Sequence, residues 1–121
     1  MTNKLTQEQQ EVLRANTIVA LSTSLHDQPR SVFVELNKIL EDKLILTDNQ
    51  MQITRDNLLQ NPQVCVLATA PGYSLFLLIQ GTATYYTEGE YFDYVKDLPS
   101  NAGYVPKGAV VIDIINVIEG K

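Results

Sequence analysis

The chain alternates short apolar segments with tight turns, and this pattern constrains the fold more than any single motif does. Six segments have the length and apolar content of β-strands: residues 17–24, 30–38, 44–47, 63–70, 73–87 and 109–118. Helical patterns occur at only three places, so most strands follow one another directly, and such strands pair antiparallel rather than form a doubly wound sheet. We therefore expect a mainly β fold, a closed or partly open six-stranded antiparallel barrel with small helices at its rim. Residues 1–121 would form it as a single domain.

Local signals predict where several of these elements begin or are interrupted. Thr6 to Gln9 and Thr87 to Glu90 both have the form of a capping box, which predicts a helix start at each place. The continuous apolar run from Ile18 to Leu21 predicts a strand that is buried on both faces. Gly81 stands inside a long strand pattern and predicts a bulge or a close backbone approach.

Composition excludes several classes of partner. The net charge is −5 and the pI is about 4.7, and no stripe of Lys and Arg occurs, so we expect neither nucleic acid nor an anionic membrane as a partner. No apolar run approaches the roughly 20 residues of a membrane span, and the first ten residues lack a signal-peptide pattern. The single cysteine, Cys65, is expected to be a small buried residue and fits a reducing compartment, so we expect a cytoplasmic protein.

The usual catalytic and metal-binding patterns are absent from the sequence. His26, the only histidine, lies in the turn Leu25 to Pro29, where a surface position is the simpler interpretation. One histidine and one cysteine far apart do not predict a zinc site. Neither of the common glycine-rich nucleotide-binding patterns occurs.

The segment from residue 46 to residue 64 is the best candidate for a binding site. A strand, a polar loop and a helix start follow one another there, as in anion-binding sites. If the helix begins near Thr54, the N–H groups of about Ile53 to Asn57 could hold a phosphate, with Arg55 or Arg30 adding positive charge. The alternative is a capped helix without a ligand, in which Thr54 caps its own turn and Asp56 complements the helix dipole.

The order of three segments resembles a known family. The sequences "ALSTSLHDQPRSVFVE", "KLILTDNQMQITRDNLLQNPQVCVLATA" and "LFLLIQGTATYYTEGEYFDYV" are similar to the pyridoxamine 5′-phosphate oxidase-like, FMN-binding split-barrel family, and most of all to its short single-domain flavoproteins. The resemblance implies a six-stranded split barrel that forms a homodimer, with FMN in a cleft between the subunits. By position, it implies cofactor contacts from Ser31, Val32, Thr47, Asp48, Asn49, Met51, Gln52, Thr54 and Arg55.

One position departs from the family pattern. Relatives usually have a lysine, which neutralises the FMN phosphate, directly before the residue that matches Thr54, and this chain has Ile53 there. A buried dianion without a nearby cation is unfavourable, so Arg55 or Arg30 would have to replace that lysine. We expect an FMN-binding flavoprotein that is a small oxidoreductase or electron carrier, with no side chain that identifies itself as catalytic. The alternative is a split-barrel dimer that binds FMN weakly or not at all and serves as a non-catalytic ligand-binding or interaction module.

Overall fold

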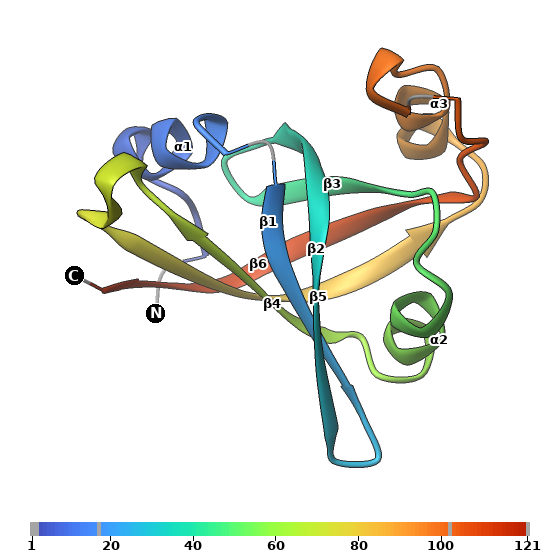
Figure 1. Cartoon of the computed structure of the whole chain (residues 1–121), viewed down its shortest axis with the longest axis horizontal. Helices are drawn as coiled ribbons and strands as arrows, with labels where there is room; N and C mark the ends of the chain where they lie inside the picture. The colour runs from blue at the N-terminus through green and yellow to red at the C-terminus, as the bar shows by residue number, and fades with distance from the viewer. Residues whose placement is uncertain (1–2, 17, 102, 121) are drawn as a thin grey trace.

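The computed structural model describes residues 3–16, 18–101 and 103–120, and within these ranges six strands form a closed antiparallel barrel (Figure 1). Around the barrel the strands follow the order β1-β2-β3-β6-β5-β4, and pairing of β4 with β1 closes it. The strands are β1 (Ile18–Leu25), β2 (Gln28–Ile39), β3 (Lys43–Asp48), β4 (Gln63–Thr69), β5 (Phe76–Tyr86) and β6 (Gly108–Gly120). The helices are α1 (Gln7–Arg14), α2 (Gln52–Gln60) and α3 (Glu90–Lys96), with short 3-10 turns η1 (Pro71–Tyr73) and η2 (Pro99–Asn101). The predicted six-stranded antiparallel barrel with small helices is confirmed.

A two-residue turn joins β1 to β2, and the two strands project from the barrel as a hairpin (Figure 1). Leu25 pairs with Gln28, and the turn residues His26 and Asp27 have φ angles of 52° and 61°. Positive φ at both central residues is typical of the hairpin turns whose twist matches the strands. The strand therefore begins two residues before the predicted Arg30, and His26 is an exposed turn residue.

The two edges of β2 are paired over different parts of the strand. It pairs with β1 from Gln28 to Glu35, but its register with β3 runs only from Leu36 to Ile39, with a bulge between Leu36 and Lys38. Among the described strands, none pairs with the second edge of β2 over residues 28–35. This opening in the sheet leaves room for a binding cleft.

The barrel interior is apolar, and its outer face is only partly covered. Leu21, Leu46, Leu77 and Ile112 are fully buried inside the barrel. Ile18 on the outer face of β1 is 53% exposed, so the prediction that this strand is buried on both faces is wrong. The reason is that the described helices leave this part of β1 open; Thr17, the predicted first residue of the strand, lies outside the described residues.

Gly81 marks a bulge, as the sequence predicts. The register of β5 and β6 shifts between Gln80 and Gly81, where Gln80 pairs with Asn116 and Gly81 pairs with Ile114. A Cβ atom on Gly81 would lie 2.6 Å from the carbonyl oxygen of Asp113. The close approach of the two backbones therefore requires a glycine at this position.

The helix starts agree with the sequence in one case out of three. At α1 the Thr6 hydroxyl accepts from the Gln9 N–H and the Gln9 side chain accepts from the Thr6 N–H, so this capping box is confirmed. At α3 the N-cap is Gly89, with φ 91° and no side-chain cap, so the predicted capping box at Thr87 is wrong. At α2 the helix begins at Gln52, and Thr54 lies buried inside its first turn instead of capping it.

The three helices lie at different places on the barrel. Contacts join α1 to β4 and β2, α2 to β1 and β5, and α3 to β6 and β3. Only α2 follows directly on the polar loop after β3, so it alone places its first turn beside the opening along β2 (Figure 1). Among the described residues, no helix has the length and apolarity needed to cross a membrane.

Candidate functional site

A cleft of about 400 Å³ lies between the unpaired edge of β2 and the first turn of α2. Its size falls within the usual range of small-molecule sites, roughly 300–1,000 Å³. We call it the α2 cleft. Seven of the ten predicted site residues line it: Arg30, Val32, Thr47, Asn49, Met51, Gln52 and Thr54.

Five lining residues were not predicted, namely Phe33, Val34, Glu35, Gln50 and Ile53. The sequence offered the Ile53 N–H as a phosphate donor and its side chain as the place of a missing lysine; in the structure Ile53 lines the cleft and is 54% exposed. The strand residues were missed because alternation assigns Phe33 and Glu35 to the other face of β2. An open strand edge, however, lets side chains of both faces reach the same cleft.

The first turn of α2 presents unpaired backbone donors. The Arg55 N–H donates to the Met51 carbonyl at 2.9 Å, which makes it the first N–H bonded within the helix. Among the described residues, no hydrogen bond is formed by the N–H groups of Gln52, Ile53 and Thr54, and no acidic side chain stands in this turn. Such a terminus binds anions, because the free N–H groups and the helix dipole both favour negative charge.

A buried acceptor in the cleft also lacks a partner. The Oδ1 atom of Asn49 is inaccessible to solvent and forms no hydrogen bond with the described residues. A buried polar atom without a partner is unfavourable in a native protein and often marks the place of a ligand or an ordered water. Because this oxygen is inaccessible to solvent, a ligand hydroxyl or N–H in the cleft would reach it only after the Asn49 side chain turns toward the cleft.

The charges that line the cleft are balanced. Arg30 is its only basic side chain and is exposed, and Glu35 is its only acidic one and is half-buried. A ligand anion at the first turn of α2 would therefore have the helix N–H groups and Arg30 as its immediate partners. That is a weak set of cations for a doubly charged phosphate.

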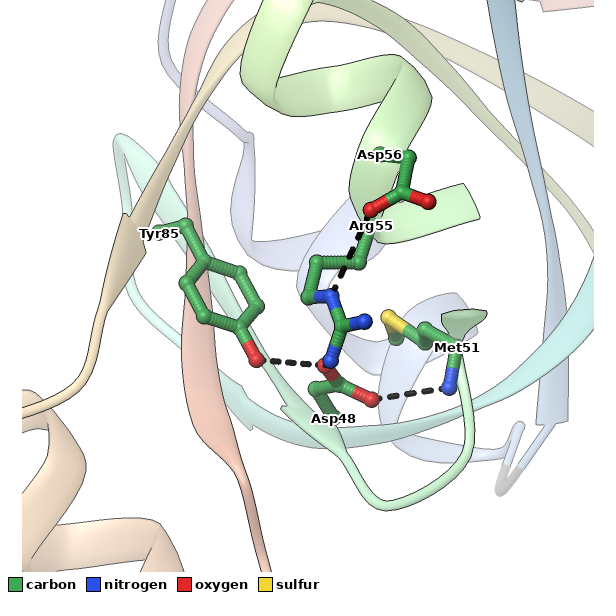
Figure 2. A network of polar contacts seen from close by, with 5 residues as sticks. All are labelled: Asp48, Met51, Arg55, Asp56 and Tyr85. Carbon is green, nitrogen blue, oxygen red and sulfur yellow. Dashed lines mark hydrogen bonds and ion pairs between the residues drawn. The ribbon is translucent and has the colours of Figure 1, made fainter. Parts of the chain in front are cut away.

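Beside the cleft, a buried carboxylate holds the loop that leads into α2 (Figure 2). Asp48 has no exposed surface, and its Oδ1 accepts from the Met51 N–H at 2.8 Å. Its Oδ2 accepts from the Tyr85 hydroxyl and lies 3.9 Å from Nη1 of Arg55. Burial raises the pKa of Tyr85, and the hydrogen bond to Asp48 raises it further, so the phenol keeps the proton that it donates.

Three predicted site residues lie outside the lining of the cleft. Ser31 is exposed on the other face of β2, where its Oγ lies 2.8 Å from Oγ of Ser22. Asp48 faces Tyr85, and the Arg55 guanidinium lies between Asp48 and Asp56, with Nε 3.7 Å from Oδ1 of Asp56. Strand alternation accounts for Asp48, because its neighbour Thr47 points to the cleft, whereas Ser31 lies against Ser22 of β1. Tyr85 was missed altogether, since no local pattern connects it with a residue 37 positions earlier.

An exposed apolar surface adjoins the cleft on the outside of the barrel. In register across β2, β1, β4, β5 and β6 lies the row Phe33, Ala20, Leu67, Leu78 and Ile118. We call this row, together with Ile18 and Phe76 beside it, the outer apolar face. Phe33, which is 81% exposed, lines both the α2 cleft and a groove in this face, so the two surfaces are continuous.

Other kinds of catalytic chemistry find little support among the described residues. Within residues 3–16, 18–101 and 103–120, no three His, Cys, Asp or Glu side chains are grouped so that they could hold a metal ion. Cys65 is half-buried, and burial raises the pKa of its thiol, the opposite of what activates a nucleophile.

Comparison with known proteins agrees with this architecture. The sequence matches the pyridoxamine 5′-phosphate oxidase family over residues 5–116. An uncharacterised protein of Methanocaldococcus jannaschii is 35% identical over 120 residues, which cover 94% of this chain and 79% of that protein. The structure of HupZ from group A Streptococcus superposes with a TM-score of 0.84 at 21% identity and covers 95% of this chain and 93% of its own. An FMN-binding protein from Syntrophomonas wolfei superposes with a TM-score of 0.77 at 18% identity, covering 92% of this chain and 82% of its own.

The match over residues 5–116 takes in all of the elements that build the α2 cleft, from β1 through most of β6. The solved structures share the barrel at low identity and therefore support the fold alone. The family match and the M. jannaschii relative, at 35% identity, go further. The chain belongs to the pyridoxamine 5′-phosphate oxidase family and has its split-barrel fold.

Proposed function

We propose that residues 1–121 form a single FMN-binding domain that works as a homodimer, as a small flavoprotein oxidoreductase or electron carrier. One observation carries the proposal. The α2 cleft brings together an uncapped helix N-terminus, an unpartnered buried acceptor on Asn49 and the cation of Arg30. These groups match, in order, a phosphate, a hydroxyl-bearing chain and the negative charge of an FMN molecule.

Each part of the cleft would have a separate task. The N–H groups of Gln52, Ile53 and Thr54 would hold the phosphate, with Arg30 as the cation in the lining and Arg55, paired with Asp48 and Asp56, beside it. The Asn49 Oδ1 would accept from a hydroxyl of the ribityl chain. The remaining predicted contacts, Ser31, Val32, Thr47, Asp48 and Met51, would position the ring and the loop. When bound, FMN would supply the redox chemistry, and the protein would supply position and electrostatics.

The homodimer is proposed from the outer apolar face. Five large apolar side chains that stand exposed around one row of the barrel are more than a monomer usually leaves in contact with water: Ile18, Phe33, Leu67, Phe76 and Ile118. A second copy of the chain would cover this face, and because Phe33 joins it to the α2 cleft, the cofactor would lie next to the interface. The lone cysteine is the reason for proposing the cytoplasm as the location.

The exact reaction is left open by the side chains of the cleft. Apart from the Glu35 carboxylate, no described residue in the lining is an evident proton donor or acceptor for a substrate, and no side chain is assigned a catalytic role. Oxidation of pyridoxamine phosphate itself is not proposed, because a second phosphate would need a second group of basic side chains and Arg30 alone lines the cleft.

A second function has one specific observation in its favour. Ile53 stands exposed where relatives have a phosphate-neutralising lysine, and Arg55 is held by Asp48 and Asp56. Both features would weaken FMN binding, and a barrel that binds no cofactor would then serve as a ligand-binding or interaction module.

Purification separates the two functions. Protein produced in flavin-sufficient cells should be yellow and show a flavin absorption spectrum, and mass spectrometry of the released ligand should identify FMN. Colourless protein that added FMN does not restore would support the cofactor-free module. A released ligand whose mass and absorption spectrum match a deazaflavin would point to that cofactor, which the small number of basic residues disfavours.

A further inference from the structure

Arg55 is the one basic side chain in the first turn of α2, and it is already paired with an internal anion. Its guanidinium lies 3.9 Å from Oδ2 of Asp48, a residue with no exposed surface, and 3.7 Å from the exposed Asp56 (Figure 2). An exposed ion pair such as that with Asp56 contributes little. The pair with Asp48 differs, because Asp48 is fully buried and a buried carboxylate loses more than an exposed one when its cation moves away.

The position of the Asp48 carboxylate is fixed from several sides. The Met51 N–H and the Tyr85 hydroxyl donate to its two oxygens, and the Lys107 N–H donates to its backbone carbonyl at 2.8 Å. Tyr85 itself fits only because residue 108 is a glycine. A Cβ atom there would lie 2.4 Å from Cζ of the Tyr85 ring. Residues from β3, β5 and β6 thus combine to keep a negative charge directly behind the anion-binding end of α2.

We propose that Asp48 is a specificity-determining residue, because its carboxylate competes with the phosphate of the ligand for Arg55. This inference rests on the proposed function and deepens it. While Arg55 is paired with Asp48, Arg30 is the only basic side chain that lines the α2 cleft. In addition, the negative charge of Asp48 repels a second anion near the same helix terminus. The cleft therefore gains less from a ligand phosphate than a helix terminus with a free arginine would gain.

The Asp48→Asn substitution tests this competition, because the amide keeps an oxygen for the Met51 N–H and removes the charge. We expect FMN to bind about tenfold more tightly to D48N than to the wild type, while riboflavin, which has no phosphate, changes less than about twofold. General damage to the fold cannot produce a gain restricted to the phosphate-bearing flavin. Equal or weaker FMN binding to D48N would overturn the proposal.

Two further variants show whether the tighter FMN binding of D48N depends on Arg55. In an Arg55→Gln background, the D48N gain should shrink to less than about twofold, since the cation that the two anions share is gone. Asp56→Asn is the matched control, because it removes the exposed partner of Arg55 and should change FMN affinity less than about twofold. A gain that persists undiminished without Arg55 would contradict the competition.

Inorganic phosphate provides a test that does not depend on flavin binding. Phosphate should raise the Tm of D48N more than that of the wild type, and equal increases would count against the proposal even if neither protein binds a flavin.

If D48N does not fold, nuclear magnetic resonance of the wild type decides. The Arg55 Nε–H signal should shift on addition of phosphate, and an unchanged signal at saturation would exclude Arg55 as a shared partner. Absence of any flavin binding would overturn the proposed function instead.

Discussion

At the scale of single residues, Ile53 is the main weakness of the proposed phosphate site, because an apolar side chain stands where a lysine is expected. Its side chain lines the α2 cleft beside the free N–H groups of the first turn of α2. We expect Ile53→Lys to tighten FMN binding roughly tenfold, because a hydrogen bond to a charged group contributes about 1.5–3 kcal/mol and part of it is lost to solvent here. Fluorescence titration with FMN and with riboflavin measures the effect, and a gain shared equally by riboflavin would show that the phosphate is not involved.

Tyr85 should make stability depend on alkaline pH. Its pKa is raised in the folded protein above the ordinary value of 10.0, first by burial and then by the hydrogen bond to Asp48. A group whose pKa is raised on folding contributes stability that is fully present below the unfolded pKa and is lost as the pH rises above it toward the folded pKa. The difference in unfolding free energy between wild type and Tyr85→Phe should therefore be constant below about pH 9 and shrink above about pH 10. Urea denaturation at a series of pH values measures it, and a difference that grows with pH would contradict this account.

At the scale of the elements, the sequence predicted correctly those features that depend on neighbouring residues alone. The capping box at Thr6 and the bulge at Gly81 depend on residues close in sequence or on the properties of glycine itself, and both are present. The start of α2 was misplaced because Met51 is held by Asp48, which in turn is fixed by Tyr85 from a distant strand. The start of α3 was misplaced because Gly89, at φ 91°, turns the chain where a capping box at Thr87 would need a helical residue.

The residues of the α2 cleft likewise fall into those that the sequence predicted and those that distant contacts place there. The loop and helix start that the sequence singled out do line it, and so does Arg30. Phe33, Glu35 and the direction of the Arg55 side chain depend on where β2 separates from β3 and on the Asp48 carboxylate. Those are tertiary contacts that no spacing in the sequence encodes.

The bulge between β5 and β6 gives a prediction at this scale. Gly81→Ala places a Cβ atom 2.6 Å from the Asp113 carbonyl oxygen and the Ile112 Cγ2, so the two strands must move apart. We expect the unfolding free energy to fall by about 1–3 kcal/mol, the usual cost of overpacking. Gly120→Ala is the matched control, because its Cβ would meet only the Phe76 side chain at 3.9 Å and should change stability by less than about 0.5 kcal/mol. Chemical denaturation of both variants checks this, and equal losses would contradict the role given to the bulge.

At the scale of the whole molecule, the outer apolar face predicts a homodimer. Light scattering at micromolar concentration should give twice the 13.5 kDa chain mass. Phe33→Asp should shift the mass toward one chain, since a charge would be buried at the interface. Val105→Asp is the control, because Val105 is equally exposed, at 82%, but lies outside this face, and the variant should stay dimeric. A wild type with the mass of one chain would remove the dimer and the cofactor position beside its interface.

FMN binding by the wild-type chain tests the central claim most directly. Protein freed of bound flavin is titrated with FMN while flavin fluorescence is followed, and equilibrium dialysis gives the stoichiometry. The account predicts saturable binding of one FMN per chain, with riboflavin bound less tightly because it lacks the phosphate for the first turn of α2. No saturable binding of FMN up to about 1 mM, a free energy weaker than about −4 kcal/mol, would contradict it.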